Sequence, residues 1–147
     1  MSLGRVETMD RVFLIGRILL GCFYLHGAYR HFADLEALAR SAALHGVPAP
    51  HVAVLVAGAL LGFGGASLLL GLFPAVGTAA LILFFVPVTF VMHAFWADAD
   101  PVLRQMDLVS FGRNVALLGA SLMFSAIPRP WAYSVEARLH LPVRALI

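Results

Sequence analysis

Residues 75–96 read AVGTAALILFFVPVTFVMHAFW, and this stretch decides the fold class. Its 22 residues include no Asp, Glu, Lys or Arg. At about 1.5 Å per residue, a helix of this length crosses the roughly 30 Å hydrocarbon core of a bilayer. A core helix of a soluble protein would show one polar face, which this stretch lacks. The stretch therefore predicts a membrane-spanning helix.

The rest of the chain has the same apolar character. Of its 147 residues, 61% are hydrophobic and only 12% are charged, whereas soluble domains carry about 25% charged residues. The formal charge of +2 is too small to indicate nucleic-acid binding. A single cysteine, Cys22, excludes an intramolecular disulfide and a multi-cysteine metal site. The length suits one membrane domain covering residues 1–147.

Apolar runs and turn residues predict four membrane helices, roughly at residues 10–29, 51–73, 75–96 and 108–127. Apolar residues recur at helical spacing within residues 30–50, so we expect a short amphipathic helix at the membrane interface there. Residues 129–147 form a tail that we expect along the membrane surface. The predicted fold is all-α: an integral membrane four-helix bundle with a short interfacial helix between the first and second membrane helices.

The arginines predict the orientation of the bundle, because four spans place both termini on one side. Five arginines flank the termini: Arg5, Arg11, Arg129, Arg138 and Arg144. Three lie in the opposite connections: Arg30, Arg40 and Arg104. Since cytoplasmic loops carry an excess of basic residues, this distribution predicts cytoplasmic N- and C-termini.

Small residues spaced by four mark one face of the second predicted span. They are Gly58, Gly62 and Ala66. Such a face lets another helix backbone approach closely. We expect it to pack against a helix, either of a partner subunit or of a second copy in a homo-oligomer.

Arg17 lies inside the first predicted span, where a charged group is costly. One interpretation is that its long side chain extends to the cytoplasmic interface. The other is that it points into the bundle and holds a polar or anionic partner. The same helix face continues with Gly21, Tyr24 and Ala28, which is small and polar and so favours the bundle interior.

Several other polar residues are expected at one level in the outer half of the bundle: Tyr24, His26, His93 and Asn114. Around an apolar cleft these groups would hydrogen-bond the carbonyls of a quinone. They would equally serve to hold helices together. The spacing of the histidines does not indicate haem ligation. No Asp or Glu lies in the middle of a predicted span, which argues against an ion-coupled transporter.

Short motifs give the chain a family resemblance. They are RILLG at 17–21, His26-Gly27, LHGVPAP at 44–50, Gly65, LLLGL at 68–72, HAFW at 93–96 and NVALLGA at 114–120. In this order and spacing, over about residues 11–127, the chain resembles the DoxX family. That family usually has a lysine soon after the first-helix glycine, where this chain has Arg30. Its residue before the asparagine is often lysine, and here it is Arg113.

The resemblance implies a four-helix protein of the bacterial inner membrane. The larger group includes the small membrane subunit of archaeal thiosulfate:quinone oxidoreductases. We therefore expect a subunit of a redox system that binds quinone or anchors a quinone-reducing partner, and at most the membrane subunit of an oxidoreductase. The candidate quinone residues are His93, Asn114, Arg17, His26 and Tyr24.

Two other functions compete with this expectation. The chain would be a non-enzymatic accessory or assembly subunit of a larger membrane complex, or a small-solute or lipid carrier. The sequence shows no evident haem, flavin or metal site, so any electrons would come from a membrane or peripheral redox partner.

Overall fold

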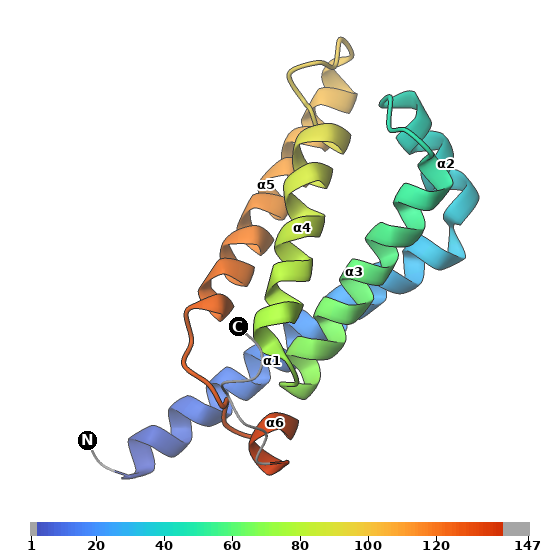
Figure 1. Cartoon of the computed structure of the whole chain (residues 1–147). Coiled ribbons are helices and arrows are strands. Elements are labelled where there is room, and N and C mark those ends of the chain that lie inside the picture. The colour runs from blue at the N-terminus through green and yellow to red at the C-terminus, as the bar shows by residue number, and fades with distance from the viewer. Residues whose placement is uncertain (1–2, 140–147) are drawn as a thin grey trace.

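The computed structural model describes residues 3–139, which form six helices and no strand (Figure 1). The helices are α1 (Leu3–Ala33), α2 (Leu35–Leu44), α3 (Pro50–Leu70), α4 (Pro74–Met92), α5 (Pro101–Ser125) and α6 (Val135–Arg138). Helices α1, α3, α4 and α5 are each long and apolar enough to cross a membrane. The predicted all-α membrane bundle is confirmed.

The long helices pack in chain order, α1 on α3, α3 on α4 and α4 on α5. Helices α1 and α5 diverge, so Figure 1 shows two arms, α1 with α3 and α4 with α5. The start of α1, the α3–α4 turn and α6 lie at one end of the bundle. Helix α2 and the α4–α5 loop lie at the other end.

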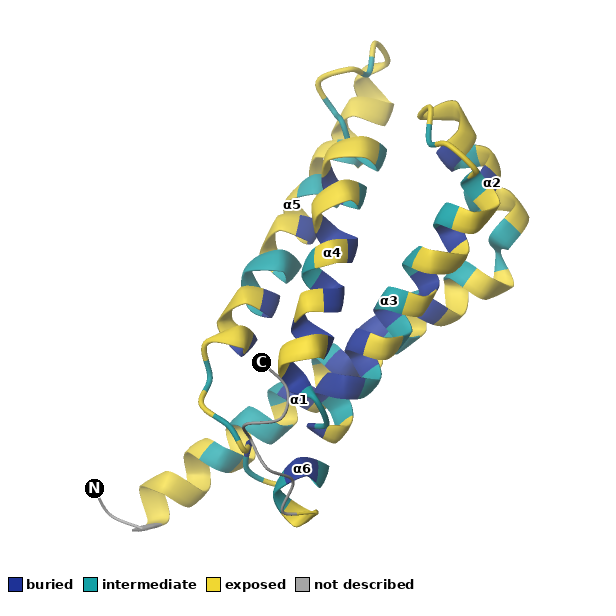
Figure 2. Ribbon diagram, in the orientation of Figure 1, coloured by how far each residue is buried: buried dark blue, intermediate teal, exposed yellow. Residues whose placement is uncertain are grey.

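The outer surface of the long helices is exposed and apolar (Figure 2). Leu19, Leu83 and Met123 are 67%, 62% and 72% exposed, and they come from three different helices. A monomeric soluble protein rarely leaves so much contiguous apolar surface in water. Lipid around the bundle accounts for this exposure.

Glycines bring the backbones of α1 and α3 together. A Cβ atom added at Gly65 would lie 3.0 Å from the Gly21 carbonyl oxygen. One at Gly58 would lie 2.9 Å from the His31 Cβ, and one at Gly62 3.5 Å from the Ala28 Cβ. We expected the face of Gly58 and Gly62 to pack against a helix of a partner subunit or of a second copy. The structure corrects this expectation, because α1 of the same chain packs against these two glycines.

The helix bounds differ from the predicted ones mainly at their polar ends. Helix α1 begins well before residue 10, because Glu7 and Arg11 form an ion pair one turn apart on its surface. Helix α5 begins at Pro101, seven residues earlier than predicted. The Asp100 carboxylate caps it by accepting from two backbone amides, those of Val102 and Leu103.

Helix α2 confirms the short amphipathic helix between the first two spans. Its buried residues, Ala39 and Ala42, pack against Val54 of α3. The described part of the tail folds against the end of the bundle and buries Trp131, which is 2% exposed. The tail's residues 140–147, including Arg144, lie outside the described residues.

Candidate functional site

A cleft of about 270 Å³ lies between the two arms. All four long helices line it: Phe23, Tyr24, His26 and Gly27 of α1, Leu61 of α3, Phe84 and Phe85 of α4, and Arg113, Asn114 and Leu117 of α5. The residues from α3, α4 and α5 lie near the middle of their helices. The cleft is therefore at mid-depth of the bundle.

Four of the ten residues that line the cleft are aromatic: Phe23, Tyr24, Phe84 and Phe85. The Tyr24 and Phe85 ring centroids are 5.7 Å apart, and those of Phe84 and Phe85 are 5.0 Å apart at an interplanar angle of 80°. Edge-to-face contacts of this kind are a favoured geometry for aromatic pairs. These rings give the cleft an apolar surface that suits a flat ring.

Two buried side chains present polar atoms without partners at this wall. The Tyr24 residue is fully buried, and its hydroxyl makes no hydrogen bond within the described residues. Ser121 lies near that hydroxyl; its own hydroxyl donates to the Leu117 carbonyl, and its oxygen is the nearby protein acceptor toward which the Tyr24 hydroxyl can turn. The Asn114 side chain is 5% exposed and likewise makes no hydrogen bond to the described residues. Buried polar groups normally have partners, so both are candidate ligand contacts.

Two basic side chains complete the lining. His26 and Arg113 are exposed residues on opposite sides of the cleft, on α1 and α5. Neither forms a hydrogen bond or ion pair with the described residues. The structure thus brings three of the five predicted residues, Tyr24, His26 and Asn114, into one cleft.

His93 does not line this cleft. It follows the last residue of α4, and its Nδ1 lies 3.1 Å from the Asp107 Oδ1. Eight residues separate it from Phe85, about 12 Å along a helix. Asp107 of α5 is therefore the partner of His93. This pair joins the ends of α4 and α5.

Arg17 is also outside the cleft, at the end of the bundle that holds α6. It is fully buried, which confirms the interior interpretation. Its Nε donates to the Leu68 carbonyl at 3.0 Å and its Nη2 to the Leu69 carbonyl at 3.3 Å. Its Nη1 donates to the Ala132 carbonyl of the tail at 2.9 Å. A cation at the carbonyl end of a helix is stabilising, so Arg17 closes the end of α3.

Two aromatic rings and a glycine enclose the Arg17 guanidinium. Its central carbon lies 5.7 Å from the Phe13 ring centroid and 5.3 Å from that of Trp131. Gly71 leaves room for it at the end of α3. Tyr24 lies seven residues further along α1, about 10 Å away. Arg17 therefore joins α1, α3 and the tail, and each of its three side-chain nitrogens already donates a hydrogen bond.

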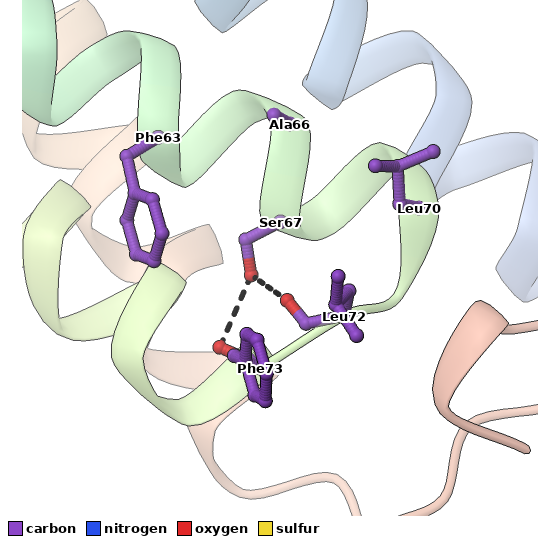
Figure 3. Close-up of a pocket in the computed structure, with 6 residues that line it drawn as sticks. All are labelled: Phe63, Ala66, Ser67, Leu70, Leu72 and Phe73. Carbon is purple, nitrogen blue, oxygen red and sulfur yellow. Dashed lines mark hydrogen bonds between the residues drawn. The ribbon is translucent and has the colours of Figure 1, made fainter. Parts of the chain in front are cut away.

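A smaller hollow of about 90 Å³ lies beside the α3–α4 turn (Figure 3). Its one polar side chain is Ser67, whose hydroxyl lies 2.7 Å from the Leu72 carbonyl oxygen and 3.1 Å from that of Phe73. The hydroxyl therefore stabilises the turn. This hollow lacks free polar groups comparable to those of the larger cleft.

Sequence reasoning missed the aromatic half of the site and gave Arg113 no role in it. Phe84 and Phe85 stand among many apolar residues, and nothing in their spacing marks them as cleft lining. Arg113 had a visible signal. It is a charged residue in the middle of an apolar helix, next to Asn114, and it has no acidic residue within four positions.

Four membrane-length helices around a partly polar cleft define a small multi-pass membrane protein. The DoxX family model matches residues 12–94, which is more than half of the chain. The chain belongs to the DoxX family. No curated protein and no solved structure matches it. The family match covers most of α1 and the next three helices, whereas Arg113 and Asn114 lie beyond it.

Proposed function

We propose that this protein is a small subunit of a redox system in a bacterial inner membrane and binds a quinone in the cleft between α1 and α5. The observation that carries the proposal is that the buried Tyr24 and Asn114 side chains line the same cleft as several aromatic rings, and that no protein group in the described residues meets hydrogen-bond geometry with the Tyr24 hydroxyl. In this proposal the arginine distribution places the α6 end on the cytoplasmic side.

The cleft and a quinone head group are chemically complementary. A quinone is a flat apolar ring whose two carbonyl oxygens accept hydrogen bonds. Phe85 and its neighbouring rings supply the apolar wall, and Tyr24 and Asn114 supply the donors. The volume of about 270 Å³ lies just below the roughly 300–1,000 Å³ of small-molecule sites, which suits a head group of one or two fused rings.

The quinone supplies the redox chemistry when it is bound. The chain's own residues bind it, orient its carbonyl oxygens toward α1 and α5, and shield one face of the ring from lipid. The electrons come from a partner redox subunit.

Binding of a short-chain quinone analogue to the protein in lipid nanodiscs tests the proposal. Tyr24→Phe and Asn114→Leu each remove a donor, and a net hydrogen bond is worth about 0.5–1.5 kcal/mol. Each variant should therefore bind about 2- to 12-fold more weakly. Ser125→Ala is the matched control on α5, because the Ser125 hydroxyl is exposed and donates to the Leu122 carbonyl.

His93→Ala separates this site from the one first expected from the sequence. It removes a side chain about 12 Å from the aromatic wall and should leave the affinity unchanged. Unaltered binding in both the Tyr24 and the Asn114 variants would refute the assignment of the cleft.

An accessory role and a carrier role stay alternative proposals. The accessory role was expected to use the face of Gly58 and Gly62, which α1 covers in this structure. A stable protein partner without bound quinone would favour the first alternative, and solute or lipid flux through liposomes that contain only this protein would favour the second.

A further inference from the structure

Arg17 and Arg113 lie well inside two of the membrane-length helices, α1 and α5, and their surroundings are opposite. Arg17 is fully buried, and three of its nitrogens donate to backbone carbonyls. Arg113 is exposed and has no hydrogen bond or ion pair with the described residues. Every side-chain nitrogen of Arg17 thus has a partner in the fold, whereas the Arg113 guanidinium at the cleft has none among the described residues.

The surroundings of Arg113 offer it no counter-charge. Among residues 3–139, no Asp or Glu lines the cleft. The nearest acid along α5 is Asp107, six residues away or about 9 Å along the helix, and it is held by His93. An uncompensated charge at mid-depth of a membrane protein marks a functional site by default.

We infer that the cleft binds its ligand as an anion: a ring whose ionised oxygen is held by Arg113, with Tyr24 and Asn114 donating to the remaining oxygens. This inference rests on the proposed quinone site and specifies the class of quinone, namely one with an acidic ring hydroxyl. Arginine suits the role because its planar group stays charged and presents several donors to an oxygen anion.

The other polar groups at the cleft are compatible with a ligand that carries a single negative charge. Tyr24 and Asn114 add neutral donors, and His26 faces Arg113 from α1 without adding an acid. A neutral quinone would leave the Arg113 charge uncompensated, whereas an anionic ring would pair with it in surroundings of low polarity, where charge-assisted hydrogen bonds are strong.

Two probes with the same ring system test the inference. One is a 3-alkyl-2-hydroxy-1,4-naphthoquinone, which is an anion at pH 7.5, and the other is the neutral 3-alkyl-2-methyl-1,4-naphthoquinone. Binding to the intact protein in nanodiscs is measured by titration calorimetry, with empty nanodiscs as the blank. The wild-type protein should bind the anion about 10- to 100-fold more tightly, as expected for hydrogen bonds to a charged group.

Arg113→Gln should weaken binding of the anion much more than binding of the neutral probe and so reduce the preference to less than about threefold, and Arg113→Lys should retain part of the preference. Arg40→Gln is the control, since it removes one exposed positive charge on α2, away from the cleft. The Arg40→Gln variant should keep the preference for the anionic probe.

The outcomes separate the two proposals. Equal binding of both probes to the wild-type protein, or a preference that Arg113→Gln leaves intact, overturns the anion inference while the quinone site stands. If neither probe binds, both proposals fail. If Arg113→Gln weakens the binding of both probes equally, Arg113 contributes to the structure of the cleft but does not distinguish the anion from the neutral probe, and the inference is again overturned.

Discussion

Adding one methyl group at Gly71 tests whether Arg17 holds the end of the bundle together. Gly71 follows α3 with φ 62° and ψ 41°, in the left-handed region. A Cβ atom there would overlap the Arg17 guanidinium and lie 2.5 Å from the Ser134 Cβ. Gly71→Ala therefore combines backbone strain with displacement of Arg17 from its carbonyl partners.

The magnitude follows from these two effects. A left-handed conformation costs a residue with a Cβ about 1–2 kcal/mol. Moving the guanidinium away from even one of its three carbonyls costs about another 1.5–3 kcal/mol, because a hydrogen bond to a charged group is lost. We expect Gly71→Ala to lower the free energy of unfolding by about 2.5–5 kcal/mol in total.

Gly46→Ala provides the matched control. Gly46 also has a positive φ, 74°, but a Cβ atom there would meet nothing within 4 Å. This variant should lose only the backbone contribution, about 1–2 kcal/mol. Both variants are unfolded by denaturant titration in mixed micelles and followed by circular dichroism. Equal losses in the two variants would refute the structural role assigned to Arg17.

Two further predictions concern helix ends and helix contacts. Asp100→Ala removes the cap of α5 and should cost about 1 kcal/mol in the same unfolding titration; an unchanged midpoint would count against the cap. Gly64→Ala places a Cβ atom 2.5 Å from the Leu81 side chain and should cost about 1–3 kcal/mol by overpacking. Gly112→Ala meets nothing and should gain up to about 1 kcal/mol; if the two glycine variants shifted stability alike, the assigned α3–α4 contact would be wrong.

The number of spans could be predicted because each long helix contains an apolar run with few charged residues, bounded by glycine, proline or charged residues. The early start of α5 was also present in the sequence, since Asp100 followed by Pro101 is a cap and first-turn pair. That pair was counted as loop because the first turns of α5 are polar. The partner of the Gly58 face could not be predicted, because spacing shows that a helix approaches closely but not which one.

For the candidate site, the sequence could predict only the level of each residue along the bundle, by counting residues from the expected helix ends. Tyr24, His26 and Asn114 share a level because their distances from the helix ends correspond. His93 was misplaced because α4 ends at Met92, which leaves its ring beside Asp107 at the loop. The fixed role of Arg17 depends on the Ala132 carbonyl, 115 residues away in the chain, and such a contact leaves no local pattern.

Photolabelling tests the central claim, that the cleft between α1 and α5 is a quinone site, most directly. An azido-quinone is irradiated with the protein in nanodiscs, and the labelled residues are mapped by mass spectrometry. The structure predicts labels within residues 23–27 and 113–117, displaced by excess unlabelled quinone and reduced in Asn114→Leu. Labels confined to the hollow at residues 63–73, or labels that excess quinone does not displace, would contradict the claim.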